Sequence, residues 1–208
     1  MGKYFMEFIG TFFLVFTVGM TVIEPSAGPL APLAIGAVLM VMVYTGRHIS
    51  GGHYNPAVTL SVLVRGRIQG MDAINFMVVQ IVAGFAAAMV VGFLKPDVAL
   101  NPIQHDVVNS LIAEFLFTFA LCFVFLNTTT AKSTEGNSYF GLAIGATVMV
   151  GAYAVEYISG SAFNPAVAFG ISLMGITAFT HIWIYLVACF LGGGVAGWAF
   201  LAMNPDDQ

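Results

Sequence analysis

Charged residues are scarce in this chain. Lysine, arginine, aspartate and glutamate make up 8% of the residues, against ~25% in ordinary soluble domains. Hydrophobic residues make up 59%, and the mean hydropathy is +0.94. This composition excludes an ordinary soluble domain and indicates a protein that crosses the membrane several times. The formal net charge of −4 is small, and we expect no nucleic-acid partner.

Cysteine and histidine are also few. Both cysteines lie in apolar stretches, where a buried thiol behaves as a small apolar residue. The histidines lack the spacing of metal ligands. We therefore expect no metal and no cofactor, and the absence of a nucleophile or cofactor motif argues against an enzyme. The residues concerned are Cys122, Cys189, His48, His53, His105 and His181.

Six apolar stretches are long enough to span a bilayer, which requires ~20 residues in helical form. They predict an all-α membrane protein with six transmembrane helices. The stretches run from about Tyr4 to Ile23, Pro29 to Gly46, Ala73 to Leu94, Ser110 to Asn127, Tyr139 to Ile158 and Ala178 to Leu201.

One phrase occurs twice in the chain. Asn55-Pro56-Ala57 and Asn164-Pro165-Ala166 close two similar segments that begin at His48 and Tyr157. The asparagines are 109 positions apart (164 − 55), and Glu7-Phe8 and Glu114-Phe115 are 107 apart (114 − 7). The chain is therefore a tandem repeat, with a first copy at 1–98 and a second at 107–208.

Each Asn-Pro pair predicts an abrupt helix start, because asparagine caps an orphan amide and proline has none to leave unsatisfied. The apolar segments that follow, 58–64 and 167–173, are too short to cross a bilayer. Three spans per copy give the two copies opposite orientations. We therefore expect two re-entrant half-helices whose positive N-terminal ends meet at a central pathway and repel cations.

The segments before the asparagines are rich in small residues and are expected to run extended. Their carbonyl groups would line the pathway as acceptors, beside the amide donors of the two asparagines. The expected carbonyl positions are Gly51, Gly52, His53, Tyr54, Gly160, Ala162 and Phe163.

Glu7 and Glu114 lie at matched places within membrane spans, where an ionisable group is costly. Two roles are open. Each carboxylate could accept backbone amides of a re-entrant loop, with help from Gln80, or the two could relay protons. The matched positions favour the loop-supporting role.

The basic residues predict the orientation. With a cytoplasmic N-terminus, only Lys95 lies outside, as the positive-inside rule requires. The C-terminus is then cytoplasmic too. Short loops favour the cell (inner) membrane. The residues placed inside are Lys3, Arg47, Arg65, Arg67 and Lys132.

These motifs together resemble the aquaporin and glycerol-facilitator family over essentially the whole chain. The resemblance rests on the paired Asn-Pro-Ala, the lead-in at 48–53 and the Glu-Phe openings of both copies. It implies six spanning helices plus two half-helices, a pore in each subunit, and a homotetramer in the lipid bilayer. It also implies passive conduction of water or small uncharged solutes.

The chain departs from the family at the outer filter, where an arginine usually follows the second Asn-Pro-Ala. Val167 stands there instead, which predicts a wide, apolar and uncharged filter. At the fifth-span position, a slip of one residue would put the bulkier Tyr153 into the pore. Carried over from the family, the filter positions are Ile35, Ala152, Ser161 and Val167.

Glu156 lies one helical turn from Ala152 on the same face. It could give the outer vestibule negative character, or it could hydrogen-bond the second loop. Both readings are open.

We interpret the chain as a channel for water, with glycerol, urea, ammonia or hydrogen peroxide as further solutes. Two alternatives remain. A proton-coupled transporter could use the same inverted repeat, with Glu7, Glu114 or Glu156 as carrier. A non-conducting structural protein of the same fold would need an occluded pore, against which the small side chains of Ala152 and Ser161 argue.

Overall fold

The computed structural model describes residues 1–96, 102 and 106–207. The expected repeat boundaries at residues 98 and 208, and His105, lie outside this part. Within it, six helices are long and apolar enough to cross a membrane, which confirms the six predicted spans. They are α1 (Gly2–Val22), α2 (Ala31–Ser50), α4 (Gly70–Leu94), α5 (Val107–Thr129), α6 (Phe140–Ser159) and α8 (Ile182–Met203).

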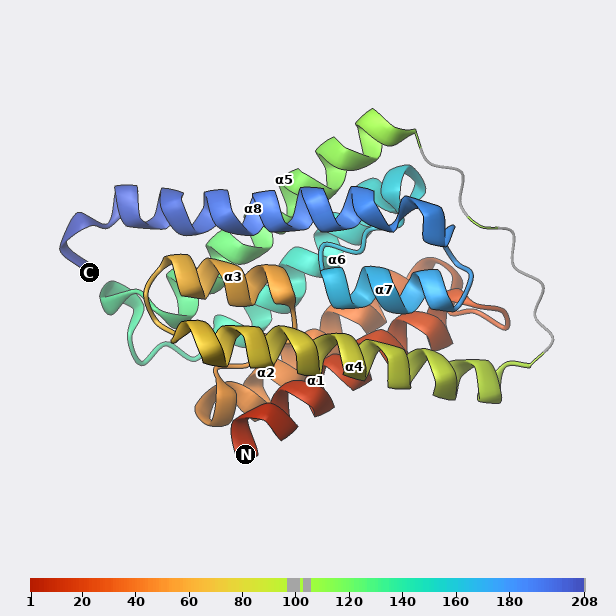
Figure 1. Ribbon diagram of the computed structural model, residues 1–208, viewed down its shortest axis with the longest axis horizontal. Coiled ribbons are helices and arrows are strands. Elements are labelled where there is room, and N and C mark those ends of the chain that lie inside the picture. Colours follow the sequence, from red (N-terminus) through yellow and green to blue (C-terminus); the bar gives the residue numbers. More distant parts are fainter. Residues whose placement is uncertain (97–101, 103–105, 208) are drawn as a thin grey trace.

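Two shorter helices, α3 (Pro56–Val64) and α7 (Pro165–Leu173), have 9 residues each. At 1.5 Å per residue, each extends about 14 Å, less than half of a ~30 Å hydrocarbon core. They lie end to end between α4 and α8, with their N-termini facing each other (Figure 1). The predicted half-helices are thus present. Short 3₁₀ turns complete the chain at Gly28–Leu30, Lys132–Thr134, Phe179–His181 and Pro205–Asp207.

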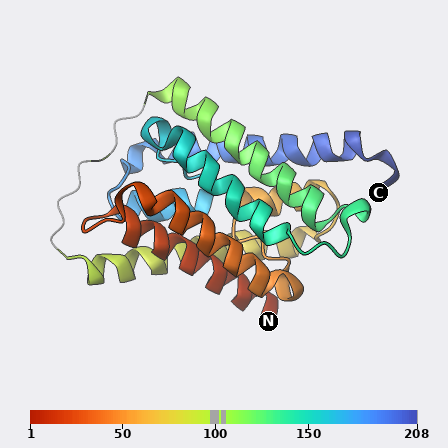
Figure 2. The ribbon, with the colours of Figure 1, turned by 180° about the vertical axis from the view of Figure 1, so that it is seen from behind.

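The long helices pack as pairs that surround the half-helices. α1 lies against α2 and α4, and α5 lies against α6 and α8. Seen from behind, α2 and α6 lie side by side across the middle of the molecule (Figure 2). Both chain termini lie in the same half of the molecule along its long axis (Figures 1 and 2).

Two glycines let the half-helices approach the long helices closely. An added Cβ on Gly84 of α4 would stand 2.7 Å from the carbonyl oxygen of Ala166, and one on Gly193 of α8 would stand 2.5 Å from that of Ala57. Side chains do not tolerate such distances from backbone atoms. Gly84 and Gly193 are themselves 109 positions apart, so the same close contact occurs once in each repeat.

The outward faces of the spanning helices bear large apolar side chains. Examples are Phe93, at 83% exposure, and Trp198, at 68%. In water such a surface would be a large unpartnered patch, whereas lipid chains cover it at no cost.

We predict that Gly193→Ala weakens the fold, because the added methyl group must push α3 away from α8. Overpacking of this kind costs about 1–3 kcal/mol, which corresponds to a fall of roughly 2–12 °C in the unfolding midpoint of a chain this size. Thermal unfolding in detergent measures it. Gly194→Ala is the matched control, because no heavy atom lies within 4 Å of its added Cβ. Equal midpoints for the two variants would contradict the packing argument.

Candidate functional site

The two asparagine caps join the half-helices at the centre of the molecule. Asn55 Nδ2 donates to the carbonyl oxygen of Phe163 at 2.9 Å, and Asn164 Nδ2 donates to that of Tyr54 at 2.9 Å. Each Oδ1 also accepts the amide two residues onward, at 2.8 Å from Ala57 and 2.9 Å from Ala166. An asparagine amide has two N–H groups. Each side chain thus keeps one further N–H for a molecule in the adjacent cavity.

This exchange requires unusual backbone at the residues before the asparagines. Tyr54 has φ of 50° and Phe163 has φ of 48°, in the left-handed region that side chains disfavour. Such strained residues cost about 1–3 kcal/mol each and persist only where their surroundings hold them. In both loops a buried carboxylate provides that hold.

The carboxylate of Glu7 collects donors from the first loop. Its Oε1 accepts the Ser50 hydroxyl at 2.6 Å and the His53 amide at 3.0 Å. Its Oε2 accepts the Tyr54 amide at 2.7 Å and Gln80 Nε2 at 2.8 Å. With no measurable exposure to solvent, the carboxylate is satisfied entirely by these partners.

Glu114 does the same in the second loop. Its Oε1 accepts the Ser159 hydroxyl at 2.7 Å and the Ala162 amide at 3.0 Å, and its Oε2 accepts the Phe163 amide at 2.7 Å. The Cys189 thiol, in the place that Gln80 occupies in the first repeat, is 3.8 Å from Oε2. Neither Glu7 nor Glu114 lines the central cavity.

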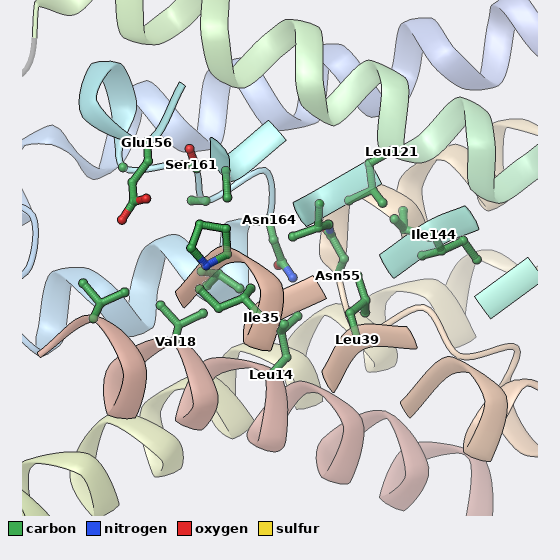
Figure 3. Close-up of a pocket in the computed structure, with 18 of the residues that line it drawn as sticks. Leu14, Val18, Ile35, Leu39, Asn55, Leu121, Ile144, Glu156, Ser161 and Asn164 are labelled. Carbon is green, nitrogen blue, oxygen red and sulfur yellow. The ribbon is translucent and has the colours of Figure 1, made fainter. Parts of the chain in front are cut away.

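The cavity runs past both asparagines, with Glu156 towards one end and Leu121 and Ile144 towards the other (Figure 3). Its volume is about 40 Å³, counted as the space open to the centre of a water molecule. Since one water needs about 10–15 Å³ on this measure, only a few can lie in it at once. The passage is therefore narrow, in contrast to the wide filter expected from Val167.

All four expected filter positions line this cavity: Ile35, Ala152, Ser161 and Val167. Tyr153 does not line it. Its side chain is 53% exposed, and its hydroxyl donates to the carbonyl oxygen of Pro29 at 3.1 Å. The small Ala152, and not the bulky tyrosine beside it, faces the cavity.

The expected carbonyl positions divide into four groups. His53, Gly160 and Ala162 line the cavity, and Gly51 lines a second hollow beyond His53. The carbonyl groups of Tyr54 and Phe163 accept the asparagine bonds described above. Gly52 lies in neither lining.

Most of the cavity wall is apolar, and its members were not singled out from the sequence. They come mainly from α1, α2, α5 and α6, and 59% of the chain is hydrophobic, so periodicity could not distinguish lumen-facing from lipid-facing positions. These lining residues are Leu14, Val18, Val22, Pro32, Leu39, Val58, Leu121, Phe125, Ile144 and Val148.

The second hollow, of different chemistry, adjoins the first at His53 and Phe125, which line both. His53 Nδ1 lies 3.1 Å from the Thr59 hydroxyl. Basic side chains gather around this hollow, and two of them are paired: Lys3 Nζ lies 2.7 Å from Asp72, and Arg67 lies 3.8 Å from Asp207. The charged and histidine lining consists of Lys3, Arg47, His48, His53, Arg67 and Asp72.

Comparisons with known proteins agree with this geometry. The model of the major intrinsic protein family matches residues 1–200, so the chain belongs to that family. It is 35% identical to Aquaporin NIP1-4 of Oryza sativa subsp. japonica, over 93% of this chain and 74% of that one. It is 34% identical to Glycerol uptake facilitator protein-like 6 of Lactiplantibacillus plantarum, over 100% of both.

Among solved structures, the X-ray structure of the aquaglyceroporin from Plasmodium falciparum is similar, with a TM-score of 0.77 and 19% identity. The match covers 95% of this chain and 94% of that one and shows the shared fold. The protein is thus an integral multi-pass membrane protein and a passive channel for water and small solutes, not an enzyme.

We predict that Glu114→Gln destabilises the second loop. The glutamine NH2 group would face an amide donor of Ala162 or Phe163, and one unsatisfied buried group costs about 1–3 kcal/mol. The unfolding midpoint in detergent and the water permeability of reconstituted vesicles should both fall. Glu135→Gln, on the exposed turn after α5, is the control. A Glu114→Gln protein as stable and permeable as the control would refute the loop-supporting role.

Proposed function

We propose that this chain conducts water and small neutral solutes through the cavity that runs beside its half-helices. The observation that carries the proposal is the continuous lining from Glu156, past Asn55 and Asn164, to His53 and Phe125, where the second hollow begins. A molecule on this path exchanges hydrogen bonds with water for those of the free asparagine N–H groups. Between these polar points the wall is apolar, so little binds tightly enough to stop the flow.

The filter chemistry favours a broad range of neutral solutes. Ile35, Ala152 and Val167 offer contact to carbon–hydrogen groups, and the Ser161 hydroxyl offers one hydrogen-bonding point. No fixed cation stands at Val167. We infer that glycerol, urea, ammonia and hydrogen peroxide pass as well as water. The names of the relatives, which include both an aquaporin and a glycerol uptake facilitator protein, support this range.

The two half-helices are the elements that exclude ions. The N-termini of α3 and α7 face each other beside the asparagines, and each carries a partial positive charge of about half an elementary charge. A cation that enters this narrow, low-dielectric passage loses its hydration and meets like charge. Without an arginine at Val167, these two ends are the main barrier to protons.

We also propose a membrane orientation and an oligomeric state for the chain. Both termini lie in the same half of the molecule, as does the basic hollow of Lys3, Arg47 and Arg67. We place this side in the cytoplasm of a cell whose inner membrane holds the protein. Glu156 then faces outward. Residues 1–98 and 107–208 are the two inverted repeats, and four chains form a homotetramer with one pore each.

A proton-coupled transporter is less well supported. A carrier carboxylate must reach the pathway, and Glu7 and Glu114 are instead enclosed by loop donors. Glu156 does line the cavity, but it lies towards one end, and no other carboxylate lines this cavity among the described residues.

Stopped-flow light scattering of reconstituted vesicles tests the function. We predict that the vesicles shrink rapidly in an impermeant osmolyte. In a separate experiment with glycerol or urea as the osmolyte, they should shrink and then reswell rapidly as the solute enters. Both rates should exceed those of protein-free vesicles by at least about tenfold, because a pore replaces dissolution in hydrocarbon. Shrinkage without reswelling would mean a water-selective pore. Vesicles no faster than protein-free ones would refute the channel.

Val167→Arg should narrow the filter and add a fixed charge. We predict that glycerol reswelling slows by about tenfold or more, as for about 1.4 kcal/mol of added barrier, while water flow falls less. The proton leak, followed with an internal pH dye, should also fall. Val167→Met, of similar length but neutral, separates size from charge. A proton leak equal in the arginine and methionine variants would contradict the electrostatic part.

A further inference from the structure

Glu156 is an acidic side chain without a partner at the mouth of the cavity. It lies in the last turn of α6, half-buried, and its carboxylate points into the passage (Figure 3). Within the described part of the chain it makes no side-chain hydrogen bond and no ion pair. Bonding to the second loop therefore does not account for it, although the loop passes nearby.

Ser161 provides a second unpaired group in the same place. Its hydroxyl oxygen is buried and has no hydrogen-bond partner among the described residues, and the side chain lines the cavity near Glu156 (Figure 3). Its backbone has φ of 52°, a conformation that suits glycine, and Gly52 stands at the matching position of the first repeat. The hydroxyl thus occupies a strained position without a structural partner.

No lysine or arginine side chain is paired with Glu156 among the described residues. Among the described residues that line the cavity there is no lysine or arginine, and Val167 holds the place where a guanidinium group would stand. Lys95, on the same end of the molecule, is bound to the carbonyl oxygens of Met20, Ile23 and Pro25. A cation is therefore attracted to the mouth, while the positive half-helix ends stop it from passing the asparagines.

We propose that Glu156 and Ser161 form a binding site for a small nitrogen-bearing monocation, such as guanidinium, which plugs the pore from this end. The carboxylate accepts two N–H groups of the planar cation, a favoured geometry, and the serine hydroxyl accepts a third. The faces of the cation rest on the apolar wall of Val22, Pro32 and Ile35. The inference rests on the proposed pore. It predicts that urea, which has the same planar shape but no charge, passes through the pore, whereas guanidinium stays bound at Glu156 and Ser161.

The test is osmotic water flow in reconstituted vesicles with guanidinium chloride on both sides, compared with equal sodium chloride and with urea. A site of about millimolar affinity is more than nine-tenths occupied at ~50 mM, so water flow through the wild-type pore should fall by up to about tenfold. Urea and sodium chloride should leave it unchanged. Each variant is scored by its ratio of rates with and without guanidinium, so that basal flows need not match.

Glu156→Gln should abolish the block, and Ser161→Ala should raise the half-blocking concentration several-fold. Glu24→Gln is the control. It removes an acid near the same end that bonds only to Ser26 among the described residues, and guanidinium should block this variant as it blocks the wild type. If Glu156→Gln does not fold, the serine variant still decides the matter.

The outcomes separate the two proposals. Wild-type vesicles with fast water flow and no guanidinium block would overturn the site and leave the channel intact. A block that persists unchanged in Glu156→Gln or Ser161→Ala would place the cation elsewhere and also overturn it. No water flow even without guanidinium would instead refute the proposed function.

Discussion

The structure depends on two buried carboxylates that hold backbone amides. Glu7 and Glu114 each bind two consecutive amides and a serine hydroxyl of a re-entrant loop. Non-helical backbone in a membrane must satisfy its polar groups within the protein, and these bonds do so. They also hold Tyr54 and Phe163 in left-handed geometry, which directs their carbonyl groups to the opposite asparagine. The joined half-helices, and the cavity beside them, follow from that geometry.

Close helix packing fixes the half-helices in addition to the hydrogen bonds of the two carboxylates. Gly84 and Gly193 bring the backbones of α4 and α8 against the carbonyl groups of Ala166 and Ala57. Each half-helix is thus fixed at its N-terminal end by hydrogen bonds and along its side by a glycine contact. The cavity can therefore be narrow without being closed, because the elements that bound it cannot shift independently.

Much of this architecture could be predicted from the sequence, because it depends on strong local signals. Asn-Pro pairs start helices, and a paired glutamate within a span needs buried donors, so the half-helices and both loop supports were foreseeable. The apolar wall was not: Leu14, Leu121 and Ile144 are indistinguishable in sequence from lipid-facing neighbours. The sequence also could not predict that Glu156 lacks a partner, since both of its expected roles were compatible with its position on the helix. Only the structure distinguishes them.

The two loop supports are not equivalent. In the first repeat, Gln80 Nε2 reaches both Glu7, at 2.8 Å, and the Thr59 hydroxyl, at 3.1 Å, and so ties α4, the loop and α3 together. In the second, Cys189 offers a weak thiol donor at 3.8 Å, and Ala168 takes the place of Thr59. The Tyr185 hydroxyl donates to the carbonyl oxygen of Ser159, but at its carboxylate the loop that carries Ser161 is held by the weaker donors. Its filter residues can be exchanged at smaller structural cost, so the second half of the chain is where selectivity can diverge while the first half preserves the fold.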